Sequence, residues 1–356
     1  MALNSEAGQR VPEPERKSAT FVCTQTSASS VMTVLAVRHV TTYRYTRPVR
    51  FGEHRIMFRP RDSNDQRLLA ATIETSPKAE IRWMHDVFGN GVTLATIKGE
   101  ADTLRFETNI ALDHTPEMVP RFRTEERAKL WPFEYDAETL PDLAAYMRPH
   151  HPTPEVDAFA RKFTRSGLET ETGHLLMTMT MGIRESLKYS RRTDPGTQLP
   201  IQTLTTGTGT CRDYTLLMME ACRALGFAAR FVTGYIYVPA RDRPGAKRGG
   251  GATHAWVQVF LPGAGWVEFD PTNGIVGSKD LIRVGVAREP RQARPLSGSF
   301  VGSRDDYLGM QVEVEVSADN GLARATAEAT AAGRRLRRAT AANVERGAQQ
   351  RARDTY

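Results

Sequence analysis

The sequence predicts an α+β protein, with an N-terminal antiparallel β-sandwich-like domain followed by a core in which a helix packs on an antiparallel sheet. Three observations predict this order. Apolar residues alternate with a period of two from Val34 to Thr115, prolines interrupt residues 116–150, and helical spacing begins near Pro154. The 356 residues are enough for two domains, each with its own core.

The first domain, residues 32–118, shows the strand pattern most clearly at residues 104–112. Apolar and polar side chains alternate there, as in a strand with one buried face. Residues 81–87 repeat the alternation, and Asn90-Gly91 beyond them predicts a tight hairpin turn with positive φ angles. The pattern therefore predicts an all-β domain in this region.

The second domain is predicted at residues 154–290, after a proline-rich junction over 119–153. Pro154 favours a helix start, and Gly226 favours a helix end. This half of the chain therefore predicts mixed helices and strands. The expected elements are helices at 154–165, 172–189 and 211–225, a loop at 190–210, and strands at 228–238, 253–260 and 265–270.

The two ends of the chain differ in composition from the middle. Residues 1–31 are polar and aperiodic and predict a disordered leader. Residues 291–316 are assigned to a C-terminal extension, and residues 317–356 form a tail rich in Arg and Ala. The tail carries +4 of the net charge of +7, so the rest of the chain has too little charge to require a nucleic acid partner.

Several classes of protein are excluded by what the sequence lacks. No apolar run reaches the roughly 18 residues of a membrane-spanning helix, and no secretion signal is visible, so we expect a cytoplasmic protein with no membrane partner. Three cysteines, an odd number, argue against a disulfide framework and against a multi-cysteine zinc site. Because phosphate-binding glycine motifs are also missing, we expect no metal, nucleotide or other cofactor.

The sharpest chemical feature is Cys211 in the segment Thr206-Gly-Thr-Gly-Thr-Cys-Arg-Asp213. Helical spacing begins at this cysteine, so its sulfur lies on the first turn of a helix. Unpaired backbone N–H groups and the positive end of the helix dipole favour the thiolate there, which is the form that attacks acyl carbons. The preceding glycines let the chain turn sharply and leave the sulfur open.

A base and an orienting group are available in His254 and Asp270. His254 begins one predicted strand and Asp270 ends the next, and the short segment 262–265 joins them. Two strands joined in this way pair antiparallel, so both side chains lie at one edge of the sheet. The carboxylate can then hold the imidazole and leave its other nitrogen for the sulfur.

Longer segments around these residues resemble the bacterial transglutaminase-like proteins. They are TGTCRDYTLLMMEACRALGFAARFVTGY, ATHAWVQVFLPGAGWVEFDPTNG, HVTTYRYTRPVRFGEHRIMFRPRD and WMHDVFGNGV, and the resemblance covers residues 33–290. It implies an N-terminal β domain and a papain-related transglutaminase-like core. It also implies that Cys211 is the nucleophile, His254 the general base and acid, and Asp270 the residue that orients His254.

The activity that the resemblance implies is acyl transfer from an amide of a protein or peptide substrate through a thioester, with an amine or water as acceptor. We expect the backbone N–H of Cys211 to hold the oxyanion, with Gln198 or Gln202 as a second donor. Two alternatives remain open. One is a cysteine peptidase that uses only water, and the other is a binding scaffold whose triad is vestigial.

Other conspicuous residues are interpreted as structural. Cys222 is expected in the core, and Asp213 is explained by the helix dipole, although a second catalytic carboxylate is the alternative. Trp256 is expected in the core or in the wall of the active site. His150-His151 lacks the further ligands of a metal site. The basic segment 241–251 is a connection, with a substrate-selecting lid as the alternative hypothesis.

Overall fold

The structure is a computed structural model, and it leaves the predicted leader 1–31 and the segment 241–251 outside the described residues. The predicted tail 317–356 also lies outside them, except for its first two residues. No helix in the described part of the chain is long and apolar enough to cross a membrane. The described residues are 33–116, 123–192, 196–238 and 253–318.

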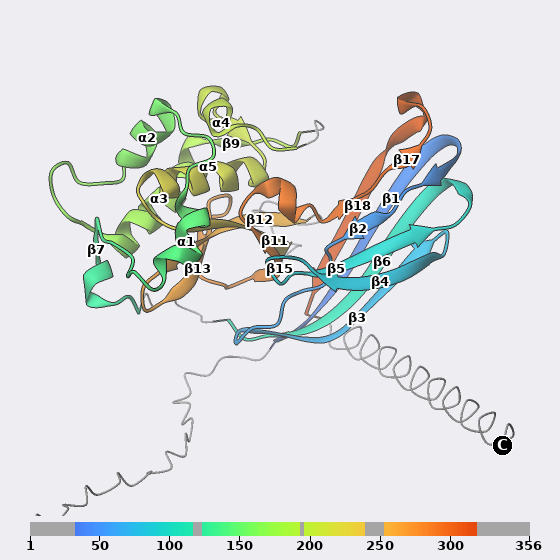
Figure 1. The fold of residues 1–356 in the computed structure, drawn as a ribbon, viewed down its shortest axis with the longest axis horizontal. Helices are drawn as coiled ribbons and strands as arrows, with labels where there is room; N and C mark the ends of the chain where they lie inside the picture. The colour runs from blue at the N-terminus through green and yellow to red at the C-terminus, as the bar shows by residue number, and fades with distance from the viewer. Residues whose placement is uncertain (1–32, 117–122, 193–195, 239–252, 319–356) are drawn as a thin grey trace, which may run out of the picture.

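The N-terminal domain is a sandwich of two antiparallel sheets, and it lies at one end of the molecule (Figure 1). The first sheet has the order β17-β1-β6-β3, with β18 also paired to β1; its strands are β1 (Thr33–Phe51), β3 (Gln66–Ser76), β6 (Glu100–His114), β17 (Phe300–Val301) and β18 (Tyr307–Ser317). The second sheet has the order β16-β2-β5-β4; its strands are β2 (His54–Ile56), β4 (Ala79–His85), β5 (Gly91–Ile97) and β16 (Leu296–Ser297). Alternate side chains of both sheets form a buried core that includes Ile56, Ala95, Leu104 and Phe106.

The last three strands return to the N-terminal domain from the far end of the sequence. β18 pairs antiparallel with β1 from Ala36↔Ser317 to Tyr45↔Tyr307. The segment 291–316, assigned above to a C-terminal extension, thus supplies most of the residues of β16, β17 and β18. Strand β1 has a partner on both sides, β6 and β18, over most of its length.

The core domain has one antiparallel sheet with the order β14-β13-β12-β11-β15. Alternate residues of β12, from Ala255 to Leu261, pack with α5 and its neighbours into the largest apolar cluster. Figure 1 shows the helices gathered at the end of the molecule opposite the sandwich, with this sheet between the two. The strands are β11 (Ala229–Ile236), β12 (His254–Leu261), β13 (Gly265–Asp270), β14 (Ile275–Val276) and β15 (Leu281–Ala287).

The predicted α+β class is confirmed, and the predicted helices are close to the observed ones. Helix α2 (Pro154–Arg161) is shorter than expected, α3 (Thr172–Ser186) ends earlier, and α5 (Cys211–Ala224) agrees within one residue. The predicted loop 190–210 contains a further short helix. The remaining elements are α1 (Leu140–Met147), α4 (Pro200–Thr206), the two-residue strands β7 (Leu130–Trp131), β8 (Thr170–Glu171), β9 (Lys188–Tyr189) and β10 (Thr208–Gly209), and single 3-10 turns at Glu126–Ala128, Pro290–Ala293 and Arg304–Asp306.

The predicted turn at Asn90-Gly91 is wrong in its geometry. The hairpin between β4 and β5 exists, but the positive φ, 71°, belongs to Gly89. Asp86 organises a longer connection, because its Oδ1 accepts hydrogen bonds from the backbone N–H groups of Phe88 and Asn90 at 3.0 and 2.9 Å. Asn90 is therefore free to turn its side chain toward the core domain.

The buried side chain of Asn90 joins the two domains. Its Nδ2 donates to the carbonyl of Val286 on β15 at 2.7 Å, and its Oδ1 accepts from the N–H of Val286 at 2.9 Å. Arg61 donates a further hydrogen bond to Oδ1 at 2.8 Å. Asn90 thus satisfies the same two backbone groups that a neighbouring strand would satisfy.

We expect Asn90→Ala to lower the free energy of unfolding by about 2–4 kcal/mol, because it leaves two buried backbone groups of Val286 without partners. Chemical denaturation followed by circular dichroism measures the change. Asn64→Ala is the control, since Asn64 is exposed. Equal stabilities of the two variants would contradict this role for Asn90.

Candidate active site

Cys211 is the first residue of α5, as the sequence predicts. Gly207, with φ of 62°, ends α4, and the chain then runs through β10 to the start of α5. A Cβ atom on Gly209 would lie 3.0 Å from Cβ of Asp213, so only glycine lets this segment pack so tightly against the first turn of α5. Cys211 keeps 7% of its surface exposed.

Asp213 fixes the segment that precedes the cysteine. Its buried carboxylate accepts hydrogen bonds from the N–H and the hydroxyl of Thr210 at 2.8 and 2.9 Å, and from the N–H of Gln198 at 2.7 Å. Arg192 adds an ion pair at 3.3 Å. These contacts agree with a structural role for Asp213. One carboxylate holds both Thr210, directly before α5, and Gln198, in the segment before α4.

The two glutamines considered as oxyanion donors make other contacts. Nε2 of Gln198 donates to the carbonyl of Thr208 at 3.0 Å. Oε1 of Gln202 accepts from the N–H of Leu199 at 3.0 Å, and this side chain is exposed at the start of α4. Both side chains thus stabilise the backbone of the segment before Cys211.

His254 and Asp270 lie together at one edge of the core sheet. Strands β12 and β13 pair antiparallel, and Nε2 of His254 is 2.8 Å from Oδ2 of Asp270. Both side chains are fully buried. The carboxylate also accepts hydrogen bonds from the N–H of Thr272 at 2.9 Å and from Nδ2 of Asn273 at 2.8 Å. The structure therefore brings together the histidine and the aspartate that the sequence predicts.

Asn273 belongs to this group of side chains, and the sequence analysis did not single it out. Its Nδ2 lies 3.4 Å from Nε2 of His254 as well as near Asp270. It follows Asp270 by three residues, in the turn that ends β13. An amide two residues after the Asp-Pro pair was the available signal, since Asn is frequent in turns and provides two donors.

The electrostatics of His254 favour its protonated form. Burial acts to lower its pKa, but the charge and the hydrogen bond of Asp270 act more strongly together, so the pKa is raised to about 10. The Cys211 thiol contributes in the same direction. Nδ1 makes no hydrogen bond of ordinary geometry to any described residue, so it is the ring nitrogen left for the sulfur. Asp270 has a lowered pKa, because His254, Asn273 and Thr272 outweigh its burial.

These shifts predict how the stability depends on pH. The pKa of His254 is raised from 6.5 to about 10, so the contribution of this group is complete below pH 6.5 and is lost as the pH rises toward 10. The Asp270 contribution is lost only at acid pH, below its ordinary pKa of 3.8. We expect the free energy of unfolding of the wild type to fall from pH 6.5 to 10 relative to that of His254→Gln. Parallel pH profiles for the two proteins would show that the pair is not coupled.

The remaining conspicuous residues have structural surroundings. Cys222 is fully buried, and burial raises its pKa to about 12. Trp256 is fully buried with its ring 5.9 Å from that of His254, so it packs beside the imidazole. Nδ1 of His150 is 2.6 Å from a carboxylate oxygen of Glu289. Within the described ranges, no cluster of three or more potential metal ligands occurs.

Comparisons with known proteins match both domains. The family described as bacterial transglutaminase-like N-terminal region matches residues 35–113, and the transglutaminase-like superfamily matches residues 157–271. An uncharacterized protein of Mycobacterium leprae is 25% identical over 280 residues, which are 79% of this chain and 98% of the relative. An uncharacterized protein of Mycobacterium tuberculosis H37Rv is 26% identical over 290 residues, which are 78% of this chain and 91% of the relative.

Among solved structures, a proposed cysteine protease from Cytophaga hutchinsonii superposes with a TM-score of 0.60 at 18% identity. The superposition covers 80% of this chain and 91% of that one, and at this identity it shows a shared fold. The two family regions coincide with the N-terminal sandwich and with the core that carries Cys211, His254 and Asp270. The chain therefore belongs to the bacterial transglutaminase-like proteins, a family of cysteine enzymes.

Proposed function

We propose that this protein transfers an acyl group from an amide of a protein or peptide substrate, through a thioester on Cys211, to an amine or to water. The observation that carries the proposal is the buried pair of His254 and Asp270, 2.8 Å apart, whose imidazole also interacts with the Cys211 thiol. A nucleophile at the start of a helix, a base and a group that orients the base are the elements of a catalytic triad.

In the proposed reaction the thiol proton passes to Nδ1 of His254, and the resulting thiolate attacks the carbonyl carbon of the substrate amide. The imidazolium that forms beside the sulfur favours the thiolate. The first backbone N–H groups of α5 have no acceptor within the helix, so the N–H of Cys211 is available for the oxyanion. Collapse of the tetrahedral intermediate breaks the C–N bond, and His254 returns the proton to the leaving amine or ammonia.

The thioester is then resolved by an acceptor, which loses a proton to His254 as it attacks the acyl carbon. An amine gives a new amide, and water gives a carboxylic acid; in both cases Cys211 regains its thiol. Hydrolysis alone would make the protein a cysteine peptidase or amidase. The structural relative from Cytophaga hutchinsonii, described as a proposed cysteine protease, is the reason to test both outcomes.

The experiment that tests the nucleophile is alkylation of the native protein with iodoacetamide, followed by intact-mass and peptide mass spectrometry. We expect the adduct on Cys211 to form faster than on free cysteine at pH 7, because the thiolate is favoured, and peptide mapping distinguishes it from an adduct on Cys23. Cys222 is the internal control, because its buried thiol has a pKa of about 12. Reaction of Cys211 no faster than free cysteine would support the non-catalytic scaffold instead.

The acceptor is identified with a glutamine-containing peptide incubated with and without a primary amine. Amine incorporation, seen as a mass increase of the peptide, would establish acyl transfer, whereas conversion to the acid in both mixtures would establish hydrolysis. Neither product, in a sample whose Cys211 reacts rapidly with iodoacetamide, would exclude glutamine as the acyl donor.

A further inference from the structure

A second polar pocket lies on the face of the core sheet that is opposite α5. Its volume is about 630 Å³, and it is lined by the loop after β2, by the junction and by β11, β12, β13 and β15. Gln258 and Glu268 belong to it, and they alternate along their strands with Val257 and Phe269, which pack with α5. His254 and Asp270 do not line the pocket, so it is distinct from the candidate active site.

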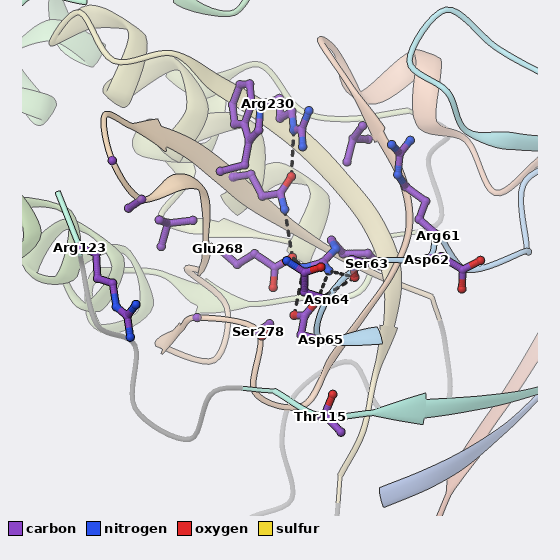
Figure 2. A pocket seen from close by; sticks show the side chains of 18 residues that line it. Arg61, Asp62, Ser63, Asn64, Asp65, Thr115, Arg123, Arg230, Glu268 and Ser278 are labelled. Carbon is purple, nitrogen blue, oxygen red and sulfur yellow. Dashed lines mark hydrogen bonds and ion pairs between the residues drawn. The ribbon is translucent and has the colours of Figure 1, made fainter. Parts of the chain in front are cut away.

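Figure 2 shows how separate parts of the chain meet around this pocket. Arg230 and Glu268 extend from the core sheet, and Ser63 and Asp65 come from the loop of the sandwich. Arg123 extends from the junction on the side of the pocket away from Arg61. A ligand held here would therefore contact both domains and the segment between them.

One of the pocket's arginines, Arg283, is fully engaged with carboxylates. Its Nη1 is 2.7 Å from Oε1 of Glu268, and its Nη2 is 2.5 Å from Oδ1 of Asp65 and from the hydroxyl of Ser63. Burial acts to raise the pKa of Asp65, but Arg283 and hydroxyl donors lower it to about 2. Both terminal nitrogens of Arg283 are thus occupied by carboxylates, so Arg283 is not available to a ligand.

Arg61 is also held by the protein. Its Nη1 donates to the carbonyl of Phe88 at 2.9 Å and to the side chain of Asn90 at 2.8 Å. This arginine thus serves the contact between the domains described above. Burial is the main cause of the lowered pKa of Arg61, and the charge of Arg283 lowers it further. Arg61 in turn helps to lower the pKa of Arg230, so its positive charge acts in the pocket.

Arg230 differs from Arg283, because it forms no ion pair with a carboxylate of the described residues. The one hydrogen bond of its guanidinium to a described residue runs from Nε to Oε1 of Gln258 at 2.8 Å. The guanidinium lies over the ring of Trp266, 3.9 Å from the ring centroid. Its pKa is lowered to about 10, mainly by burial, and Arg61 and Arg283 add repulsion. An anion beside Arg230 would relieve this electrostatic cost.

We propose that this pocket binds a ligand with a single carboxylate, and that Arg230 is the cation that holds it. Gln258 and Trp266 fix the plane of the guanidinium and leave its two terminal nitrogens to form the fork that matches a carboxylate. Trp266, Ala264 and Val267 supply apolar surface beside it. The ligand is therefore an apolar carboxylic acid, or the C-terminal residue of a peptide.

A single negative charge fits the pocket better than a dianion such as phosphate. Four arginines and three acidic residues line it, so its formal charge is close to +1. Glu268 and Asp65 are part of the wall and would repel a second negative charge. This inference does not depend on the chemistry proposed for Cys211, because none of the three candidate catalytic residues contributes to the pocket.

Titration of the full-length protein with matched small molecules tests the proposal. N-acetyl-leucine represents a peptide C-terminus, benzoate represents a free carboxylic acid, and N-acetyl-leucinamide has the same shape as the first without its charge. Binding is followed by calorimetry and by the fluorescence of tryptophan. We expect at least one of the two acids to bind, with a Kd below about 10 mM, and at least tenfold more tightly than the amide.

The outcomes separate the sources of the carboxylate. Tighter binding of N-acetyl-leucine than of benzoate indicates a peptide terminus, and the reverse indicates a free acid. The proposal fails if neither acid binds below about 10 mM, if the amide binds as well as its acid, or if inorganic phosphate binds more tightly than both. This comparison uses only the wild type, so it does not rely on any variant folding.

Arg230→Gln locates the binding site. We expect it to weaken binding of the acid by about tenfold or more, the range for loss of a charge-assisted pair. Arg82→Gln is the matched control, since Arg82 is a surface residue with 69% of its side chain exposed. A folded Arg230→Gln protein, verified by its thermal unfolding, that binds the acid like Arg82→Gln would overturn the assignment. Iodoacetamide labelling of Cys211 in the same samples reports on the active site separately.

Discussion

Cys211→Ala should reduce turnover of a glutamine-containing peptide to the background rate, a loss on the order of 10⁶ in kcat for removal of a nucleophile from a triad. The proposed thioester forms on this sulfur, and alanine has no group to replace it. We expect the free energy of unfolding to change by no more than about 1 kcal/mol, because little buried volume is lost. Ammonia release or amine incorporation measures the activity, and circular dichroism measures the fold.

Cys222→Ala is a matched control for this result, because it removes the second described thiol from the same helix. That side chain is fully buried and has Met179 as a sulfur contact at 3.9 Å, so its loss should affect packing and leave the chemistry intact. We expect near wild-type kcat with lower stability. Substantial activity in folded Cys211→Ala, verified free of wild-type protein by its mass, would show that the nucleophile lies elsewhere.

Local patterns were sufficient to predict the elements that carry the candidate site. Helix α5 begins at Cys211 because Thr210 and Asp213 cap it, and its C-terminal limit is close to Gly226. The contact between His254 and Asp270 followed from a short connection between two strands, which leaves antiparallel pairing as the simple geometry. Short-range signals in the chain determine both features.

Contacts between distant segments were not predicted, because period and turn signals do not specify which strands pair. Residues 291–316 were assigned only to a C-terminal extension, although Val312, Val314 and Val316 alternate with polar residues; their pairing with the first strand of the chain is a long-range choice. Asn90 was likewise assigned only to a turn, because turn signals are local and do not show contacts with a distant segment. Its bonds to Val286 require the two domains to be in place.

The pocket around Arg230 could not be predicted from the sequence, for a further physical reason. It is assembled from residues of a sandwich loop, the junction and four strands of the core sheet, so no single segment contains its pattern. The number of charged residues also does not reveal the pocket, because the chain has many arginines and two of the four in the pocket are held by other side chains or backbone groups. Only the arrangement in space shows that Arg230 lies over Trp266 and pairs with no carboxylate of the described residues.

Asp270→Asn should lower kcat by about 10⁴ while the protein stays folded, because the change reverses the polarity of one hydrogen bond. The carboxylate accepts a hydrogen bond from the Nε2–H of His254, which keeps the proton on Nε2 and leaves Nδ1 as the basic nitrogen toward the sulfur. An amide at this position can donate to Nε2, which moves the proton to Nδ1 and prevents it from acting as the base. The variant also loses the charge that raises the pKa of His254.

A merely structural role for Asp270 would not change the protonation of His254, so the pH dependence separates the two roles. We expect the imidazole pKa, followed by NMR, to fall from about 10 toward or below the ordinary value of 6.5 in Asp270→Asn, because burial is then opposed only by the interaction with the Cys211 thiol. Asp157→Asn, at an exposed position on α2, is the control for a lost carboxylate. An unchanged imidazole pKa together with a near wild-type kcat would remove Asp270 from the triad, whereas a lowered pKa with a large loss of kcat is what an orienting carboxylate requires.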